Sequence, residues 1–327
     1  MTDAEGRRSE APADASEIAL ADAPGIGAAG SGPPAATREK GARGTVKMFL
    51  ELVKFEHSVF ALPYAYIGAM YGVVGEWPSL AQLAWITMVM VGARAFAFVL
   101  NRAIDEEIDA RNPRTAGRAI PAGLVKAWEL WLFSAVMLAA YLLGVWQLDP
   151  IVRWLWPIPL SAFLIYPYTK RFTPVCHYWL GLCLGLAPAG AWIAVGGPIN
   201  HPAPWVLGVA VMLWTAGFDI IYATQDIECD RKDGVHSMPA DFGVAPALLQ
   251  TRVAHVVTAA LLPLGGFLAE AGWPWYVGVS IAVLLLAYEN SIVSAKDLSR
   301  VGAAFFTTNG VIAIVVFVGA LADRLIA

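Results

Sequence analysis

The sequence predicts an all-α, polytopic membrane protein with about nine transmembrane helices, and its composition is the first reason. Of its 327 residues, 58% are hydrophobic and only 15% are charged, and its mean hydropathy is +0.59. Soluble domains are nearer half apolar and a quarter charged. The 13 tryptophans and 10 tyrosines suit interfacial belts on both faces of a bilayer. The length suits a single helical bundle.

Residues 1–44 differ in composition from everything that follows. They are rich in Ala, Gly, Pro, Ser and Glu, with almost no large apolar side chains. Because such a segment cannot bury a core, we expect a disordered cytoplasmic tail, followed by a transmembrane domain over residues 45–327. The tail has no compact apolar stretch with an Ala-x-Ala site, so it does not read as a cleaved signal peptide.

Nine apolar segments follow the tail, each near the roughly 20 residues that cross a bilayer as a helix. Backbone groups in lipid must satisfy their own hydrogen bonds, so each segment should be helical. The segments are residues 48–74, 79–106, 124–147, 150–169, 176–197, 203–227, 246–270, 274–295 and 301–322. Breaks that carry proline or glycine separate several of them, at residues 75–78, 196–198 and 272–274.

The charges in the loops predict the orientation of the chain. Of the basic residues between the expected spans, one set of loops holds only Arg153 and Arg324. The other set holds Arg38, Lys40, Arg43, Lys47, Arg111, Arg114, Arg118, Lys126, Lys170, Arg171, Arg231, Lys232, Arg252, Lys296 and Arg300. Basic loops stay in the cytoplasm, which places the N-terminus inside and the C-terminus outside a bacterial-type inner membrane. This orientation needs an odd number of spans, in agreement with nine.

Two acidic motifs stand at the cytoplasmic ends of expected spans. Asn101, Asp105 and Asp109 are spaced four apart, which on a helix puts three oxygen-bearing side chains along one face. The second motif consists of Asp219, Tyr222, Asp226 and Asp230. An acidic face at the mouth of a membrane helix is costly unless it binds something positive. Two carboxylate pairs with i,i+4 spacing on the same side therefore predict a shared site for divalent cations.

The donor atoms indicate which metal that site would take. Carboxylate and amide oxygens suit hard Mg²⁺, which keeps its waters and is usually completed by substrate phosphates. Two facing carboxylate pairs suggest a diphosphate held between two magnesium ions. The alternative is that the aspartates face water or pair with nearby arginines. The three cysteines, Cys176, Cys183 and Cys229, form no CxxC or Cys/His cluster, so neither a disulfide framework nor a zinc site is indicated.

Basic residues follow both acidic motifs, and arginine and lysine both suit phosphate oxygens. The candidates for substrate binding are Arg114, Arg118, Lys170 and Arg231. The alternative is ordinary positive-inside charge, which we prefer for Arg171, Lys126 and Lys296.

Two ionisable residues lie deep inside apolar segments. Arg94 precedes Asn101 by seven residues, and Asp219 precedes Asp226 by seven, which places each about 10 Å deeper on the same face. One possibility is that the two deep residues pair with one another or with backbone carbonyls. The other is that they contact a substrate that accepts a transferred group: Arg94 would bind its carboxylate, while Asp219 and Tyr222 would position it and take part in its proton transfer. Lys54 and His57 are expected at the cavity rim or as interfacial anchors, and His177 and His201 have no evident partner.

Together these residues resemble the UbiA superfamily of intramembrane prenyltransferases. The resemblance covers residues 47–322 and rests on both acidic motifs, on Tyr166-x3-Lys170, and on the loop text of residues 108–118 and 234–237. It implies nine transmembrane helices around a central cavity. It also implies that Mg²⁺ and the diphosphate are held by Asn101, Asp105, Asp109, Asp226 and Asp230, that Lys170 and Arg118 bind diphosphate oxygens, and that Tyr166, Asp219 and Tyr222 line the reacting centre. Family members often carry lysine where this chain has His236, which leaves the role of His236 open.

Within that superfamily the chain looks most like the branch that prenylates 4-hydroxybenzoate in ubiquinone biosynthesis. The implied reaction is Mg²⁺-dependent transfer of a polyprenyl group from polyprenyl diphosphate to this acid, with release of diphosphate. A dihydroxynaphthoate of menaquinone biosynthesis is the alternative acceptor. The expected partners are these substrates and the bilayer, with no nucleic acid and no obligate protein partner. A cation- or proton-coupled transporter and a structural membrane subunit are the other classes, but transporter sites usually lie at the midplane on broken helices.

Overall fold

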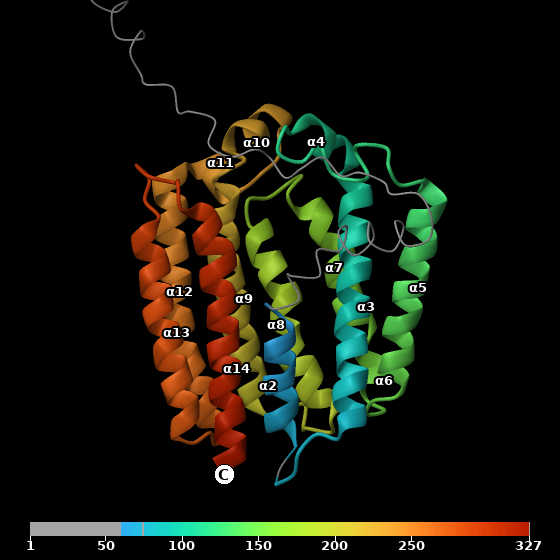
Figure 1. The fold of residues 1–327 in the computed structure, drawn as a ribbon, viewed down its shortest axis with the longest axis vertical. Coiled ribbons are helices and arrows are strands. Elements are labelled where there is room, and N and C mark those ends of the chain that lie inside the picture. The colour runs from blue at the N-terminus through green and yellow to red at the C-terminus, as the bar shows by residue number, and fades with distance from the viewer. Residues whose placement is uncertain (1–59, 74, 327) are drawn as a thin grey trace, which may run out of the picture. The chain divides into compact units, whose positions relative to one another are not determined.

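The prediction of an all-α fold is confirmed. The computed structural model describes residues 60–73 and 75–326, and within them it contains helices and one isolated bridge between Ser294 and Asp297, but no strand. The long helices run side by side, as Figure 1 shows. The expected tail of residues 1–44 and its boundary lie outside the described residues, as do Lys54 and His57.

The helices follow the expected order along the chain. They are α2 (Leu62–Gly72), α3 (Leu80–Ile104), α4 (Glu106–Arg111), α5 (Ala127–Trp146), α6 (Val152–Leu155), α7 (Pro157–Thr169), α8 (Cys176–Ala194), α9 (Pro202–Ala223), α10 (Ile227–Asp233), α11 (Met238–Phe242), α12 (Val244–Leu268), α13 (Trp273–Ile292), the π-helix η2 (Ala303–Thr308) and α14 (Asn309–Ile326).

Six stretches among the described residues are long and apolar enough to cross a membrane: α3, α5, α9, α12, α13 and η2 with α14. Each of the other three expected spans also contains a helix, but α2 has only 11 described residues and α7 has 13, after a break from α6. The protein is therefore a helical membrane protein, and nine complete spans stay a prediction.

Local sequence explains where several helices begin. Ser79 caps α3, because its hydroxyl accepts the N–H of Gln82 at 3.1 Å while the Gln82 amide accepts the N–H of Ser79 at 2.9 Å. Prolines stand in the first turn of α2, α7, α9, α11 and α13, where a missing N–H costs no helical hydrogen bond.

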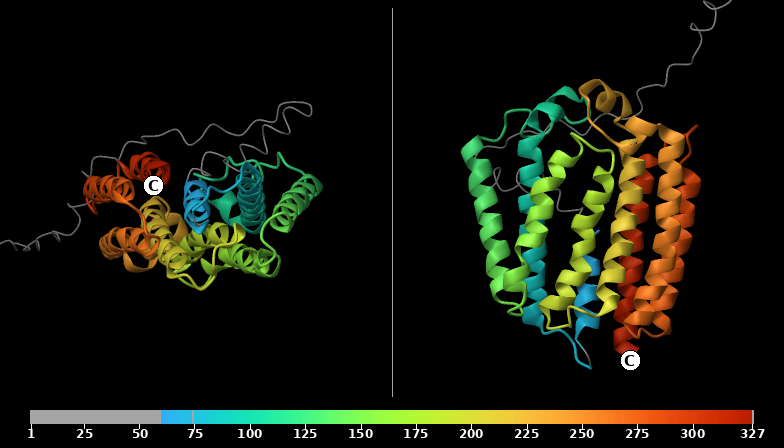
Figure 2. Two further views of the ribbon diagram at one scale, coloured as in Figure 1. Left: turned by 90° about the horizontal axis from the view of Figure 1, so that it is seen from below. Right: turned by 180° about the vertical axis from the view of Figure 1, so that it is seen from behind.

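Helix α8 packs against α2 on one side and α9 on the other, and Figure 2 shows these helices from below and from behind. The α8–α9 contact depends on small residues. A side chain at Gly181 would lie 2.2 Å from the carbonyl oxygen of Met212, and Gly185 lies against Gly208 in the same way. Such small-xxx-small pairs let membrane helices approach closely.

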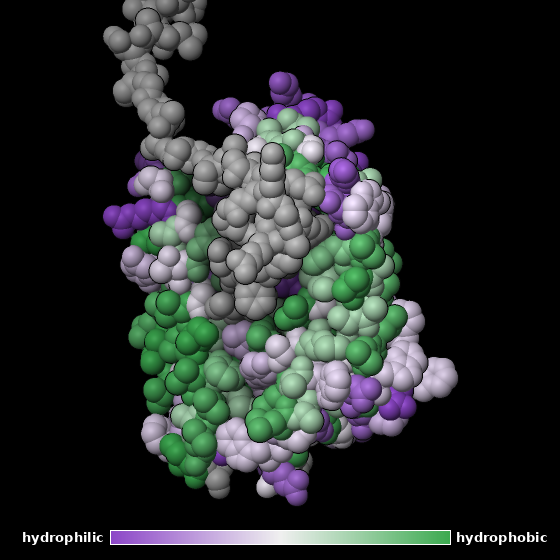
Figure 3. All heavy atoms as spheres, turned by 45° about the vertical axis from the view of Figure 1, so that its right-hand side comes forward, coloured by the Kyte–Doolittle hydropathy of each residue, from purple (hydrophilic) through white to green (hydrophobic). Residues whose placement is uncertain are grey.

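The outer surfaces of the helices carry the apolar side chains that a bilayer requires. Leu80, Val256, Phe267 and Leu284 are each more than two-thirds exposed. In Figure 3 hydrophobic side chains cover the middle of the visible face, and hydrophilic ones gather toward its ends. This distribution fits a molecule whose flanks face lipid.

The acidic motifs do not lie on straight helices as expected. Helix α3 ends at Ile104, Asp105 joins it to α4, and the second motif breaks in the same way where Asp226 joins α9 to α10. Helices α4, α10 and α11 all lie at one end of the molecule in Figure 1. The breaks turn the chain across this end, so that both motifs lie over the space between the long helices.

Candidate active site

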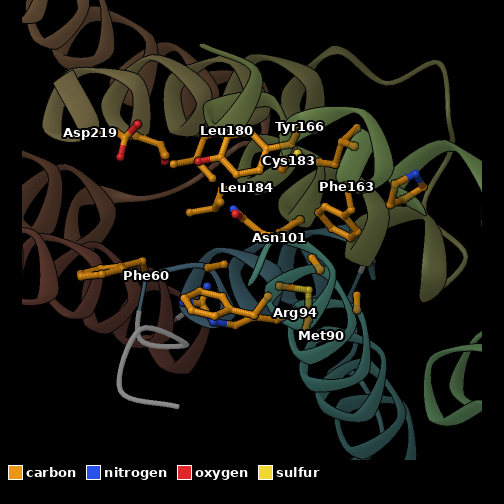
Figure 4. Close-up of a pocket in the computed structure, with 18 of the residues that line it drawn as sticks. Phe60, Met90, Arg94, Asn101, Phe163, Tyr166, Leu180, Cys183, Leu184 and Asp219 are labelled. Carbon is orange, nitrogen blue, oxygen red and sulfur yellow. The ribbon is translucent and has the colours of Figure 1, made fainter. Parts of the chain in front are cut away.

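A cavity of about 480 Å³ lies between the helices, and both acidic motifs line it. Apolar side chains line its deeper part, including Val145, Leu148 and Val152 from the end of α5 and the start of α6. The predicted site residues that line it are Arg94, Asn101, Asp105, Asp109, Arg114, Arg118, Tyr166, Lys170, Asp219, Tyr222, Asp226 and Asp230, and His236, whose role was left open, lines it as well. Figure 4 shows Arg94, Asn101, Tyr166 and Asp219 around this space. The structure therefore brings these residues to one cavity, and their assignment as a functional site stays a prediction.

Asp105 lies at the junction of α3 and α4, where it is 1% exposed. Its backbone N–H donates to the carbonyl of Asn101 at 3.0 Å, which fixes the turn. The ammonium group of Lys170 at the end of α7 lies 2.6 Å from its Oδ2, and a guanidinium nitrogen of Arg171 lies 3.4 Å from its Oδ1. Arg171, which we assigned to ordinary loop charge, thus contacts the acidic motif as well.

Asp109 on α4 is paired with two arginines. Arg118 Nη1 lies 2.8 Å from both carboxylate oxygens, and Arg102 Nη1 lies 3.2 Å from Oδ2. The hydroxyl of Thr115 donates to the backbone carbonyl of Asp109 at 2.7 Å and holds the intervening loop against α4. The loop after the first motif therefore folds back onto it.

The two motifs meet through Asp226. Arg114, from the loop after α4, donates from Nε to Asp226 Oδ1 at 2.9 Å and from Nη2 to Oδ2, and its Nη1 donates to the hydroxyl of Tyr222 at 3.0 Å. The amide of Asn112 donates to the same carboxylate at 2.9 Å. These contacts join segments more than 100 residues apart, so both motifs belong to one site.

Asp230 on α10 completes the acidic set. The hydroxyl of Ser237 donates to its Oδ2 at 2.9 Å. Burial raises the pKa of Asp230 to about 6, although this hydrogen bond acts in the opposite direction, and the nearby Asp226 raises the pKa further. The carboxyl group of Asp230 therefore loses its proton most easily when a cation lies beside it.

Deeper in the cavity, Asp219 on α9 accepts a hydrogen bond from His177 on α8, with 2.7 Å between Nδ1 and Oδ2. This contact contradicts the alternative that Asp219 pairs with Arg94. The Nε of Arg94 is buried without a hydrogen-bond partner among the described residues, and its guanidinium lies over the ring of Phe98 at 5.4 Å. Arg94 therefore keeps donor capacity at the cavity wall.

Two predicted substrate-binding residues are not brought to this cavity by the described part of the structure. Arg231 is exposed, and its Nε donates to the carbonyl of Ala240 at 2.8 Å, so α11 holds it on the outside of α10. Lys54 lies outside the described residues. Sequence spacing does not tell which side of a short loop helix faces the cavity, so the position of Arg231 could not be foreseen, and its substrate-binding role stays a prediction.

Three contacting residues were missed as site residues: Arg102, Asn112 and His177. Arg102 and Asn112 could have been found, because Arg102 follows Asn101 directly, Asn112 comes three residues after Asp109, and both carry donors that match carboxylates. His177 gave a weaker signal, a lone ionisable residue at the start of an apolar segment.

The side chains at the mouth of the cavity fit a hard divalent cation. Two features support this: the oxygen atoms that could bind the ion, and the cationic side chains that already lie against these oxygens. Five carboxylates, those of both motifs, and the amides of Asn101 and Asn112 line one cavity. Among the described residues no three His, Cys, Asp or Glu side chains are arranged around a single point. Instead, Lys170, Arg118 and Arg114 hold positive charge against the carboxylates. Positive charge already lies against these carboxylates, and their oxygen atoms are the ligands that a hard divalent ion prefers.

The fold and the site define a class of protein: a helical membrane protein whose apolar cavity is covered at one end by interleaved acidic and basic side chains. Residues 61–311 match the UbiA prenyltransferase family, and the chain belongs to that family. It is therefore a prenyltransferase, an enzyme of the class that the motifs resembled. Membership leaves the transporter and the structural subunit without support.

Two curated relatives indicate which members of the family this chain is similar to. The chain is 28% identical over 282 residues to the 4-hydroxybenzoate octaprenyltransferase of Aromatoleum aromaticum, covering 84% of this chain and 94% of that protein. It is 33% identical over 221 residues to the enzyme of the same name from Alcanivorax borkumensis, covering 67% of this chain and 75% of that protein.

Solved structures share the fold. The apo structure of a UbiA homolog from Aeropyrum pernix aligns with a TM-score of 0.75 at 32% identity, covering 82% of this chain and 98% of that one. A UbiA homolog from Archaeoglobus fulgidus, bound to GPP and Mg²⁺, aligns with a TM-score of 0.64 at 21% identity, covering 85% and 99%. At that identity the second likeness concerns the fold alone.

Proposed function

We propose that this enzyme transfers a polyprenyl group from polyprenyl diphosphate to 4-hydroxybenzoate and releases diphosphate, in a reaction that depends on Mg²⁺. The observation that supports this most is the meeting of two acidic motifs, with arginine and lysine between them, over an otherwise apolar cavity. A long isoprenoid with a multiply charged head matches those two parts. The names of the relatives support the choice of acceptor.

The head of the donor would bind at the mouth. Asn101, Asp105, Asp109, Asp226 and Asp230 would hold two Mg²⁺ ions, which when bound supply neutralisation of the charge that develops on the leaving diphosphate. Lys170, Arg118 and Arg114 would bind diphosphate oxygens directly, since all three already lie against the carboxylates that bracket the head.

Below the diphosphate head of the donor, side chains of the protein would stabilise the allylic carbon during the reaction. When the C–O bond breaks, its electron pair leaves with the diphosphate and an allylic cation remains. The aromatic faces of Tyr166 and Tyr222 line the cavity there and would stabilise this cation. Tyr222 is held in place by Phe305, whose ring stacks on it at 4.2 Å. The apolar walls exclude water, which would otherwise capture the cation.

The acceptor would bind deeper, between α3 and α9. Arg94, with donor capacity left at the cavity wall, would meet its carboxylate. The ring carbon ortho to the hydroxyl attacks the cation with a π electron pair. Asp219 would then take the proton from that carbon, and the C–H electron pair restores the aromatic ring.

The orientation of the enzyme is part of the proposal. The acidic end would face the cytoplasm of a bacterial-type inner membrane, with the C-terminus outside, as the loop charges predict. In Figure 1 the end of α14 lies opposite the end that carries α4 and α10, which supports this arrangement. Water-soluble acceptor and Mg²⁺ would enter from the cytoplasm.

The proposal is tested with purified protein in lipid nanodiscs, Mg²⁺, a series of prenyl diphosphates, and a panel of acceptors that includes 4-hydroxybenzoate and a dihydroxynaphthoate. Mass spectrometry should find a prenylated hydroxybenzoate, and EDTA should abolish it. Asp105→Ala and Asp226→Ala should each lower turnover about 100-fold or more. Asp233→Ala is the matched control, because Asp233 pairs with Arg111 outside the cavity. Near-normal turnover in either cavity variant would remove the two-metal site, and a product on naphthoate alone would replace the acceptor.

A further inference from the structure

His177 is an ionisable residue at the start of α8, and its ring has both nitrogens engaged. The side chain is almost fully buried. Nδ1 lies 2.7 Å from Asp219 Oδ2, and Nε2 accepts the backbone N–H of Met238 at 3.2 Å. A backbone N–H can only donate, so Nε2 carries no proton. The network therefore assigns the neutral tautomer in which Nδ1–H donates to the Asp219 carboxylate.

Asp219 is the acidic residue that lines the cavity beside Tyr166, well below the mouth. Leu180 and Leu184, which Figure 4 also shows, are apolar side chains that line the same cavity as Asp219. A carboxylate in such surroundings loses hydration, and a hydrogen bond to its charged form compensates. Among the described residues, His177 is the one that supplies this bond.

Met238, whose backbone N–H sets the tautomer of His177, belongs to a short stretch that also contacts the mouth of the cavity. Residues 236–238 form what we call the linking segment. The N–H of His236 donates to the carbonyl of Lys170 at 2.7 Å, and the hydroxyl of Ser237 donates to Asp230 at 2.9 Å. The next residue donates to the imidazole. Three consecutive residues thus join the diphosphate end of the site to the ring beneath it.

We propose that His177 is a positioning residue for proton removal from the acceptor ring. Its Nδ1–H holds Asp219 as a carboxylate turned toward the cavity, and the linking segment keeps Nε2 unprotonated. In the step itself, the bond from the allylic carbon to the ring forms first. The ring C–H bond then breaks, its electron pair returns to the ring, and the proton goes to Asp219, while His177 keeps its own proton. This inference rests on the proposed function.

Two substitutions separate the two hydrogen bonds of the imidazole. His177→Asn keeps an amide N–H near the position of Nδ1 and can still donate to Asp219, but it no longer reaches Met238. His177→Gln places its amide near the position of Nε2 and can accept the Met238 N–H, but it leaves Asp219 without a donor. His177→Leu removes both bonds. The three side chains have similar size, so packing changes little between them.

The measurement must distinguish ring-proton removal from binding and ionisation. The variants are compared in nanodiscs with prenyl diphosphate and 4-hydroxybenzoate, and both prenylated product and prenyl alcohol are quantified. Alcohol forms when water captures the cation, which needs no base acting on the ring. Acceptor deuterated at the reacting carbons reports whether breaking the C–H bond limits the rate.

His177→Gln and His177→Leu should lose product formation about 10- to 100-fold, the rate equivalent of one lost hydrogen bond to a charged group. They should keep the KM for prenyl diphosphate, raise the ratio of alcohol to product, and show a larger deuterium isotope effect than the wild type. His177→Asn should lie near the wild type in all three. Asp219→Asn, which is isosteric, should show the same changes as His177→Leu, and the double variant should be no worse than either.

The proposal is overturned if His177→Leu keeps the wild-type ratio of alcohol to product and isotope effect, or if His177→Asn is as impaired as His177→Leu. If the His177 variants do not fold, Asp219→Asn alone decides, since an unchanged isotope effect there removes the base that His177 is said to position. Failure of the proposed function gives a different result: the wild type itself forms no prenylated hydroxybenzoate.

Discussion

Arg114 is the cation that lies against Asp226, and replacing it should make the site bind metal more tightly. A divalent ion that binds Asp226 must first separate this pair, which includes an Nε–Oδ1 bond of 2.9 Å and a second bond from Nη2. In Arg114→Gln the competing charge is gone. We therefore expect higher affinity for metal alone and lower affinity for the prenyl diphosphate that Arg114 would otherwise bind.

The size of the effect follows from the burial of the pair. Two unit charges about 4 Å apart interact by about 4 kcal/mol at the effective dielectric constant of a protein surface. The Arg114 side chain is 29% exposed and that of Asp226 is 13% exposed, so solvent screening reduces this to about 2 kcal/mol. At 1.4 kcal/mol for each factor of ten, affinity for the ion should rise about 30-fold.

Mn²⁺ serves as the spectroscopic probe for this prediction. Free Mn²⁺ is followed by electron paramagnetic resonance during titration of protein in nanodiscs, without prenyl diphosphate, so that activity does not enter the measurement. Arg111→Gln is the matched control, because it removes the same charge three residues earlier, at the end of α4, where its own partner is Asp233, at 3.5 Å, and its side chain is 57% exposed. Equal Mn²⁺ affinity in the two variants, or weaker binding in Arg114→Gln than in the wild type, would refute the reasoning.

Three further predictions concern packing and substrate length. Gly181→Ala should lower the melting temperature by several degrees, since its new Cβ would lie 2.2 Å from a carbonyl oxygen of α9, whereas Gly190→Ala, with no atom within 4 Å, should not. Asn309→Ala should cost about 1–3 kcal/mol in thermal unfolding, because it leaves the buried indole N–H of Trp214 unpaired. Val152→Trp at the apolar end of the cavity should shorten the longest prenyl diphosphate accepted, as product masses would show; unchanged lengths would contradict it.

Much of the fold and the mouth of the site could be predicted, because both depend on local pattern. Hydropathy predicted helices in the expected places, and four-residue spacing selected Asp105 and Asp226, which the structure brings to one cavity. The spacing could not show that the chain breaks at these residues. In a helix leaving the membrane, the last turn can open toward water and neighbouring loops, and that choice depends on tertiary contacts such as Lys170 with Asp105.

The contact between His177 and Asp219 could not be predicted from spacing, because it joins residues 42 apart on two helices. It exists because glycines let α8 and α9 approach closely, and that approach fixes which faces meet. The outward direction of Arg231 has a similar origin in the packing of α11 against α10. Sequence pattern thus selected residues that stand out by their own position at a membrane surface. It missed residues such as His177, whose role depends on a partner on a neighbouring helix.

The pairing of acids with bases at the mouth has a consequence for the order of events under the proposed function. Asp105, Asp109 and Asp226 each hold a cationic partner from another segment, so their charges are paired within the protein. Metal alone would displace those partners and leave arginine and lysine without counter-charges. Diphosphate alone would be repelled by the negative charge of the carboxylates. Together, two divalent ions and one diphosphate replace both sets of partners at little change in net charge. Metal and prenyl diphosphate should therefore bind with positive coupling, each raising the affinity of the other by the same factor.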